Sequence, residues 1–344
     1  MDNLYFPNGQ IHVICHVCSF LETVKTHIDI FSFSTVYVRI FLEGEDMKKM
    51  GYLAVIFTMI VWGLSYISIK IALEVFSPIA LIFYRYVFAT IFFLIFMKYK
   101  KETFRFDKKD LPLFLGSSLF GIVLYFYFES MGVSYLTVSA ASVVLSLVPL
   151  VIMVSNFIIH NERLNKMKII TIFASILGIF LIVKNDSGGL NNTKGYVFMF
   201  LAVIFWAVFS EITSRLNKKY SEVKVAGIQT YFALLTYLPL IFFQEIDYSA
   251  VEIHHWVHII ALGVLSSAIS FILYVFAMNH IGPTESGLFV NFIPIVTIIF
   301  GFIVFGEVLT PLQLLGAAII MGTMTVMMIL DLRAHKKDII KIII

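Results

Sequence analysis

The side chains that could do chemistry in this chain are few, and they lie inside or beside long apolar stretches. Trp62 and Trp206 each fall near the middle of such a stretch, and a buried indole needs a partner for its N–H group. We expect them to form the aromatic wall of a binding cavity, with packing between helices or against lipid as the alternative. Polar groups on the same or neighbouring stretches complete the predicted substrate site: Ser65, Tyr127, Ser142, Ser210 and Asn291.

Charged candidates for the same site are Arg85 and Glu211. Arg85 follows the start of its apolar stretch by about two helical turns, and an ionisable residue within a membrane helix is a functional candidate by default. It would hold a substrate carboxylate, or else extend outward or cap backbone carbonyls. Glu129 and Glu211 lie close to the ends of their stretches, and Glu211 precedes Arg215 by one helical turn, which favours a structural ion pair instead.

Two prolines predict a hinge or gating pair. "VPLVIMVSNFIIHNERL" contains Pro149 and "IPIVTIIFGFIVFGEVL" contains Pro294, and each is followed at the same distance by a glutamate, Glu162 or Glu307. A proline within a helix removes a backbone hydrogen bond and frees a carbonyl, which in lipid needs another partner. A static kink is the alternative. We expect the two glutamates to favour the N-termini of the helices that follow.

Metal and cofactor chemistry finds little support in the sequence. The "CHVC" at 15–18 is half of a zinc motif without a second half, and "HHWVH" at 254–258 is the one histidine cluster. We interpret that cluster as an interfacial anchor. We therefore expect no catalytic residues, no metal, no cofactor and no nucleic-acid partner; the partners should be a small-molecule substrate and the lipid bilayer.

The elements that must position these residues are membrane helices. Hydrophobic residues make up 60% of the 344 residues and charged residues 14%, and the mean hydropathy is +0.93. A soluble protein carries about a quarter charged residues. Ten stretches are long enough for a spanning helix of roughly 20 residues. They lie near 51–72, 78–98, 111–129, 135–159, 167–184, 195–213, 224–243, 256–277, 283–305 and 311–331.

The placement of lysine and arginine supports these ten stretches. Basic residues gather in alternate loops and at the two ends of the chain, whereas the opposite loops hold only Lys184 and Lys194. By the positive-inside rule both termini are cytoplasmic. Enrichment in Phe, Ile and Lys indicates an AT-rich bacterial genome, so we expect a bacterial plasma (inner) membrane protein.

The chain repeats itself. At a shift of 144 residues Trp62 falls on Trp206, and at a shift of 145 Pro149 falls on Pro294. Each copy holds five helices, an odd number, so the second copy enters the membrane from the opposite side. The predicted fold is an all-α integral membrane protein of ten transmembrane helices in two inverted five-helix repeats, an architecture of transporters.

We place the first repeat at 47–190 and the second at 191–344, with a short cytoplasmic tail. Residues 1–46 form a doubtful extension, since "EGED" before Met47 is encodable as a ribosome-binding sequence. Met47 is then the expected true start.

Several motifs in order resemble one family. "WGLSYISIKIAL", "FSPIALIFYRYVFA", "VSAASVVLSLVPL", "PTESGLFVNFIPI" and "GEVLTPLQLLGA" are similar to the EamA branch of the drug/metabolite transporter superfamily, over about residues 50–331. The resemblance implies a secondary transporter of small organic metabolites, here an amino-acid exporter that works by alternating access between the repeats. The alternative is a membrane-embedded enzyme acting on a lipid or isoprenoid, which would want clustered acids or histidines at a membrane face.

Overall fold

The computed structural model describes residues 30–160, 166–184, 189–282, 286–287 and 289–343, and all regular elements in these ranges are helices. Glu162 and the two cysteines, which carried expectations above, lie outside the described residues. The chain divides into a unit of Met1–Lys49 and a unit of Met50–Ile344.

The helices of the first half coincide with the first five predicted stretches. The first helix is longer than expected, and the third and fourth are each built from several pieces. The elements are α2 (Ile30–Ala72), α3 (Pro78–Tyr99), η1 (Lys108–Asp110), α4 (Leu111–Ser118), η2 (Leu119–Leu124), α5 (Tyr125–Tyr135), α6 (Val138–Leu145), α7 (Val148–His160) and α8 (Lys166–Lys184). Local signals fix their starts: the Ser77 hydroxyl accepts the N–H of Ala80, and Pro78 is the first helical residue of α3.

The second half repeats this order. Its elements are α9 (Gly189–Asn217), α10 (Glu222–Ile241), α11 (Ile253–Ile260), η3 (Ala261–Ile269), α12 (Ser270–Ile281), α14 (Phe292–Phe305) and α15 (Pro311–Ile343). Each of the five remaining predicted stretches therefore coincides with a helix or a helical run.

The helices are suited to a bilayer. Seven candidate spans are both long and apolar enough to cross a membrane, and Phe292–Phe305 and Pro311–Met327 are shorter apolar helices. The remaining predicted span, α10, is made more polar by Lys224, Gln229 and Thr230. Large apolar side chains such as Phe173, at 69% exposure, cover the outside of the helices, as expected for a surface that faces lipid. The chain is thus a multi-pass membrane protein.

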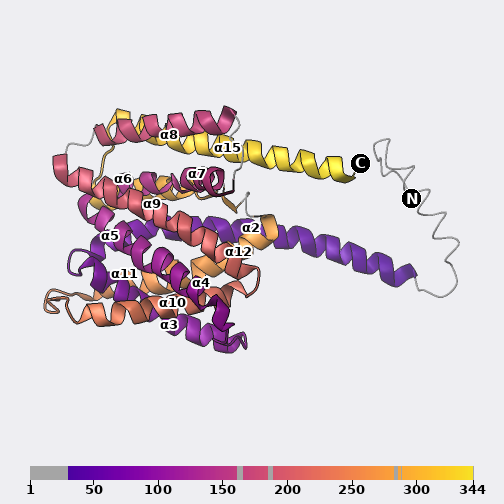
Figure 1. The fold of residues 1–344 in the computed structure, drawn as a ribbon, viewed down its shortest axis with the longest axis horizontal. Coiled ribbons are helices and arrows are strands. Elements are labelled where there is room, and N and C mark those ends of the chain that lie inside the picture. Colours follow the sequence, from indigo (N-terminus) through magenta and orange to yellow (C-terminus); the bar gives the residue numbers. More distant parts are fainter. Residues whose placement is uncertain (1–29, 161–165, 185–188, 283–285, 288, 344) are drawn as a thin grey trace. The chain divides into compact units, whose positions relative to one another are not determined.

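Three pairs of equivalent helices from the two halves pack against one another. α3 lies against α10, α8 against α15, and α6 against α14, and Figure 1 shows α8 and α15 side by side. In the sequence repeat these are the second, fifth and fourth helices of each half. Pairing of equivalents is the arrangement that two inverted repeats produce.

Both halves interrupt the fourth helix at matching positions. α6 ends at Leu145, and α7 begins three residues later, at Val148, with Pro149 in its first turn. In the second half a turn at Val290 and Asn291 precedes α14, which has Pro294 in its first turn. The prolines were expected inside continuous helices, but they start new ones, where the missing N–H has no partner to lose.

The third helix of each half contains a π-helical segment, η2 and η3. A π-helical turn inserts an extra residue and often marks a functional site. Gly121 of η2 and Ser266 and Ser267 of η3 all line the cavity described next.

Candidate substrate cavity

A cavity of about 800 Å³ lies between the two halves of the second unit. The first half contributes residues of α2, α3, η2, α5, α6, α7 and α8, and the second half contributes residues of α9, α10, η3, α12, α14 and α15. Of the residues predicted from sequence, the cavity is lined by Trp62, Ser65, Arg85, Pro149, Trp206 and Ser210.

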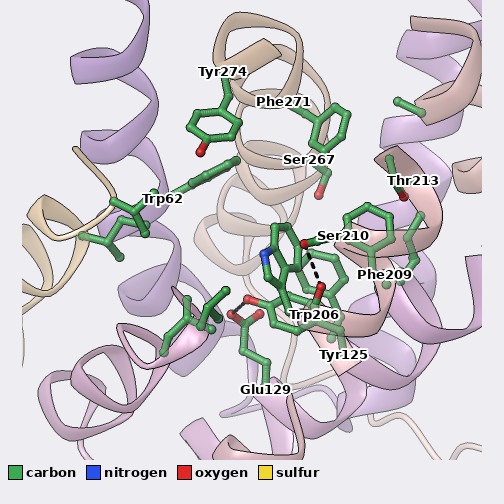
Figure 2. Close-up of a pocket in the computed structure, with 18 of the residues that line it drawn as sticks. Trp62, Tyr125, Glu129, Trp206, Phe209, Ser210, Thr213, Ser267, Phe271 and Tyr274 are labelled. Atoms are coloured by element: carbon green, nitrogen blue, oxygen red, sulfur yellow. Dashed lines mark hydrogen bonds between the residues drawn. The ribbon is translucent and has the colours of Figure 1, made fainter. Parts of the chain in front are cut away.

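Two aromatic groups face each other across the cavity (Figure 2). On one side the rings of Trp62 and Tyr274 are 5.2 Å apart, and the Trp62 indole N–H donates to the Ser266 carbonyl at 3.1 Å. On the other side the Trp206 ring packs 4.7 Å from Tyr125 and 5.1 Å from Phe209. The two tryptophans therefore line the cavity rather than facing lipid.

Ser65 and Ser210 are tied to the backbone beside these tryptophans. The Ser65 hydroxyl donates to the Trp62 carbonyl at 2.6 Å, and the Ser210 hydroxyl donates to the Trp206 carbonyl at 2.8 Å. With its proton engaged locally, each hydroxyl oxygen offers acceptor lone pairs to a ligand. The two halves thus present the same pair of side chains to the cavity.

Arg85 is 3% exposed and lines the cavity. Its Nε donates to the Ser267 hydroxyl at 2.7 Å and its Nη2 to the Ser266 hydroxyl at 3.4 Å. The guanidinium carbon lies 4.1 Å from the centroid of the Phe126 ring, within cation–π range. The side chain therefore points into the protein instead of reaching for the membrane surface.

Glu129 is a cavity residue that sequence reasoning placed only near a span end. It is 3% exposed, and its Oε1 accepts the Tyr125 hydroxyl at 2.7 Å. Its Oε2 has no hydrogen-bond partner among the described residues, and Figure 2 shows the carboxylate directed toward Tyr125 and Trp206. The helix continues to Tyr135, so Glu129 lies deeper than expected. The tyrosine one helical turn before it was the available signal.

Five predicted residues lie away from the cavity lining. Tyr127 packs against the apolar core, the buried Ser142 donates to the Ser139 carbonyl, and Asn291 donates to Thr325 at 2.9 Å. Pro294 is buried. Glu211 forms an ion pair with Arg215 at 2.8 Å, the structural alternative given for it.

Glu307 caps a helix, although not the one expected. Its carboxylate accepts the backbone N–H groups of Val138 and Ser139 at 2.9 and 3.0 Å and the Ser139 hydroxyl at 2.7 Å. This is the N-terminus of α6, in the other half of the chain, where a carboxylate is favoured by unpaired N–H groups and the helix dipole. The contact joins the two halves beyond one end of the cavity.

Lys70, near the C-terminus of α2, binds another helix of the first half at the end of the cavity where Glu307 lies. Its ammonium donates to the carbonyls of Val133 and Leu136 at 2.8 and 2.9 Å. These carbonyls lie at the C-terminus of α5, where the negative end of the helix dipole attracts a cation.

The histidine cluster has a structural explanation. Ligand atoms of Glu74, His254 and His255 lie within 4.8 Å of one another. However, the His255 Nδ1 accepts the Glu252 N–H at 3.1 Å in a capping box, so in the neutral ring Nε2 carries the proton. A protonated Nε2 is not a metal ligand; it lies 3.9 Å from Glu74 Oε2 and has no hydrogen-bond partner among the described residues.

Comparisons with known proteins agree with this architecture. A model of the EamA-like transporter family matches residues 49–184 and again residues 193–329. An uncharacterized transporter of Archaeoglobus fulgidus is 25% identical over 278 residues, covering 80% of this chain and 96% of its own. The uncharacterized transporter YetK of Bacillus subtilis is 23% identical, covering 80% of this chain and 86% of its own.

A solved crystal structure has the same fold, with a TM-score of 0.60 at 17% identity over 84% of this chain and 99% of that one. The family and the relatives are transporters and not enzymes. The chain belongs to the EamA-like transporter family of the drug/metabolite transporter superfamily.

Proposed function

We propose that this transporter exports amino acids or closely related small metabolites across the bacterial plasma membrane by alternating access. The observation that carries the proposal is the cavity between the halves, which combines aromatic walls with a buried arginine and a buried glutamate. Its volume of about 800 Å³ lies in the range of small-molecule sites. Charged groups at such depth are costly unless they serve transport or pair with a ligand.

The position of the cavity favours a state that opens to the cytoplasm. Besides its central residues, the lining includes Lys168, Asn217 and Met278, which lie at helix ends on the side that the positive-inside rule assigns to the cytoplasm. At the opposite helix ends, Glu307 and Lys70 bind helix termini of the first half. An exporter in this state would load its substrate from inside.

Exchange of the two states requires parts that can move. The matching breaks before α7 and α14 divide the fourth helix of each half into two pieces. Each piece can rotate with a different group of helices, because the backbone bonds that join the pieces, at Ser146 and Leu147 in the first half and Ile293 in the second, are those of short i→i+3 turns and not of an α-helix. We assign the hinges to these breaks, with Pro149 and Pro294 fixing the helix start beside each of them.

Counterflow in liposomes tests the proposal. Protein reconstituted with an internal pool of unlabelled amino acids should accumulate labelled amino acids, and one unlabelled competitor should abolish that uptake. Trp206→Ala should lower the exchange rate. Trp256→Ala is the matched control, since that ring packs on Phe76 and Tyr84 and does not line the cavity. Absence of exchange by folded, inserted protein would refute the amino-acid assignment.

A further inference from the structure

We propose that Glu129 and Arg85 recognise the two opposite charges of a dipolar substrate, Glu129 its ammonium group and Arg85 its carboxylate. The inference rests on the proposed function and specifies how the cavity chooses among small metabolites. It assigns substrate contact to Glu129, which sequence reasoning had not placed in the site, and it assigns to Arg85 the first of its alternatives, the binding of a substrate carboxylate.

The Glu129 carboxylate is incompletely satisfied. A carboxylate offers about four acceptor positions, yet the described residues supply only the Tyr125 hydroxyl, on Oε1. Oε2 is buried and has no hydrogen-bond partner within 3.5 Å among the described residues; the neighbouring Tyr66 hydroxyl, equally buried and unpartnered, interacts with the carboxylate and lines the same cavity. A primary ammonium group carries three donors on one positive centre, so it can meet both the charge and the open acceptor positions.

The Arg85 guanidinium has donors to spare. Guanidinium carries five N–H donors in a planar fork, and its hydrogen bonds to described residues use Nε and Nη2 on two serine hydroxyls. Those neutral partners position the group without neutralising it. The Phe126 ring beneath one face fixes its plane further. A carboxylate is the ligand that such a fork binds best, by two parallel hydrogen bonds.

The two charges attract each other but do not form a contact ion pair. Among the described residues, no N···O distance between Arg85 and Glu129 is within 4.0 Å. A structural pair buried in a membrane would close that gap, because attraction grows steeply at short range in a medium of low polarity. A gap between opposite charges is instead complementary to a molecule that carries both charges a few ångströms apart.

The aromatic groups then receive the rest of the substrate. Trp62 with Tyr274 and Trp206 with Phe209 flank the space beside Glu129 (Figure 2). Such walls bind an apolar side chain through burial and stacking. An amino acid with an aliphatic or aromatic side chain matches this arrangement, with its ammonium group at Glu129, its carboxylate at Arg85 and its side chain between the aromatic walls.

Binding measurements on purified, detergent-solubilised protein test the assignment. The probes are leucine, 3-methylbutylamine, which lacks the carboxylate, and 4-methylpentanoate, which lacks the ammonium group. Isothermal titration calorimetry gives each dissociation constant. Loss of one charge-assisted contact should weaken binding about 10- to 100-fold. We expect wild-type protein to bind leucine at least about 10-fold more tightly than either analogue.

The variants separate recognition from folding. Glu129→Gln should weaken leucine and the amine about 10- to 100-fold and leave the acid nearly unchanged. Arg85→Gln should weaken leucine and the acid and spare the amine. Glu211→Gln, which removes a charge outside the cavity, should change none of the three. Glu129→Asp should restore most of the selectivity for the ammonium group.

Two results would overturn the inference. One is wild-type protein that binds leucine no better than its analogues, and the other is a pair of variants that weakens all three probes equally. Neither result depends on transport. If the wild-type protein exchanges amino acids in liposomes but the Glu129 and Arg85 variants weaken all three probes equally, the inference fails and the proposed function stands. If instead the binding of the three probes is selective but the wild-type protein exchanges no amino acids in liposomes, the proposed function fails and the inference about Glu129 and Arg85 stands.

Discussion

Replacing Glu307 with glutamine should loosen the contact between the two halves beyond the closed end of the cavity. The carboxylate accepts three hydrogen bonds from the start of α6. Glutamine keeps one carbonyl oxygen, which can accept both Ser139 donors, while its NH₂ group then faces the Val138 N–H and that bond is lost. Because the lost bond is one to a charged group, worth about 1.5–3 kcal/mol, the contact weakens by about 2 kcal/mol.

If the contact breaks whenever the cavity opens to the opposite side, the whole loss appears in that equilibrium. A change of about 2 kcal/mol raises the population open to that side about 30-fold relative to wild type. The assay is the labelling rate of a cysteine placed at Ser142, just beyond the cap, with a membrane-impermeant maleimide added to one side of sealed liposomes. Native cysteines occur only at 15 and 18, and a background lacking them is readily made.

Glu245→Gln is the matched control, since it removes an exposed carboxylate from a loop that the charge pattern places on the same side. Its labelling rate should equal that of the parent. If Glu307→Gln also labels at the parent rate, with unaltered thermal stability, the cap does not hold the halves together and the reasoning is wrong. A large loss of folded protein would instead mean that the cap stabilises both states equally.

Three further predictions follow from other contacts. Gly316→Leu should impair folding, because even a Cβ there would lie 2.5 Å from the Gly178 carbonyl oxygen where α8 and α15 pack. Fluorescence-detected size exclusion should show a lower melting temperature for this variant. Gly322→Leu is the control and should be tolerated, because open space surrounds Gly322. Lys70→Met should lower the melting temperature by an amount equivalent to about 1–3 kcal/mol, since it leaves two carbonyls without their donor. Ser267→Ala should weaken carboxylate binding several-fold while sparing 3-methylbutylamine, because it frees the Arg85 Nε from its position.

The sequence predicted the helices well because bilayer thickness and hydrophobic length leave few choices. All ten predicted stretches coincide with helices or helical runs, and the family match falls on both halves of the chain. The interruptions were less accessible. Pro149 and Pro294 marked them, but the sequence did not show that the helices end just before the prolines, since that depends on backbone bonds in the preceding turn.

The residues that line the cavity were predicted less completely, because a side chain reaches the cavity only if its helix has the right rotation about its axis and the residue lies at the right depth in the membrane. Trp62 and Trp206 line the cavity, whereas Tyr127 and Ser142, one on each of two helices, face the packed core. The π-helical turns change the direction in which later residues point, and no periodicity predicts such an insertion. Glu129 was misjudged for a related reason: its helix extends beyond the apolar stretch, so the apparent end of the span lay inside it.

The duplication explains the scaffold of the cavity but not its charges. At the shift of 144 that aligns the tryptophans, Arg85 falls on Gln229, and at the shift of 145 that aligns the prolines, Glu129 falls on Tyr274. Both neutral counterparts also line the cavity. The second half thus supplies uncharged groups where the first half supplies charges.

A substrate held by those charges must therefore lie off the axis that relates the two halves. It should stay attached to α3 and α5 while the other half moves around it, because the same side chains provide its strongest contacts in both states. A structure with a bound amino acid is expected to show the ammonium group against α5, whichever side of the membrane the cavity faces. A substrate centred between Trp62 and Trp206, with neither charge engaged, would show that aromatic contact alone determines binding.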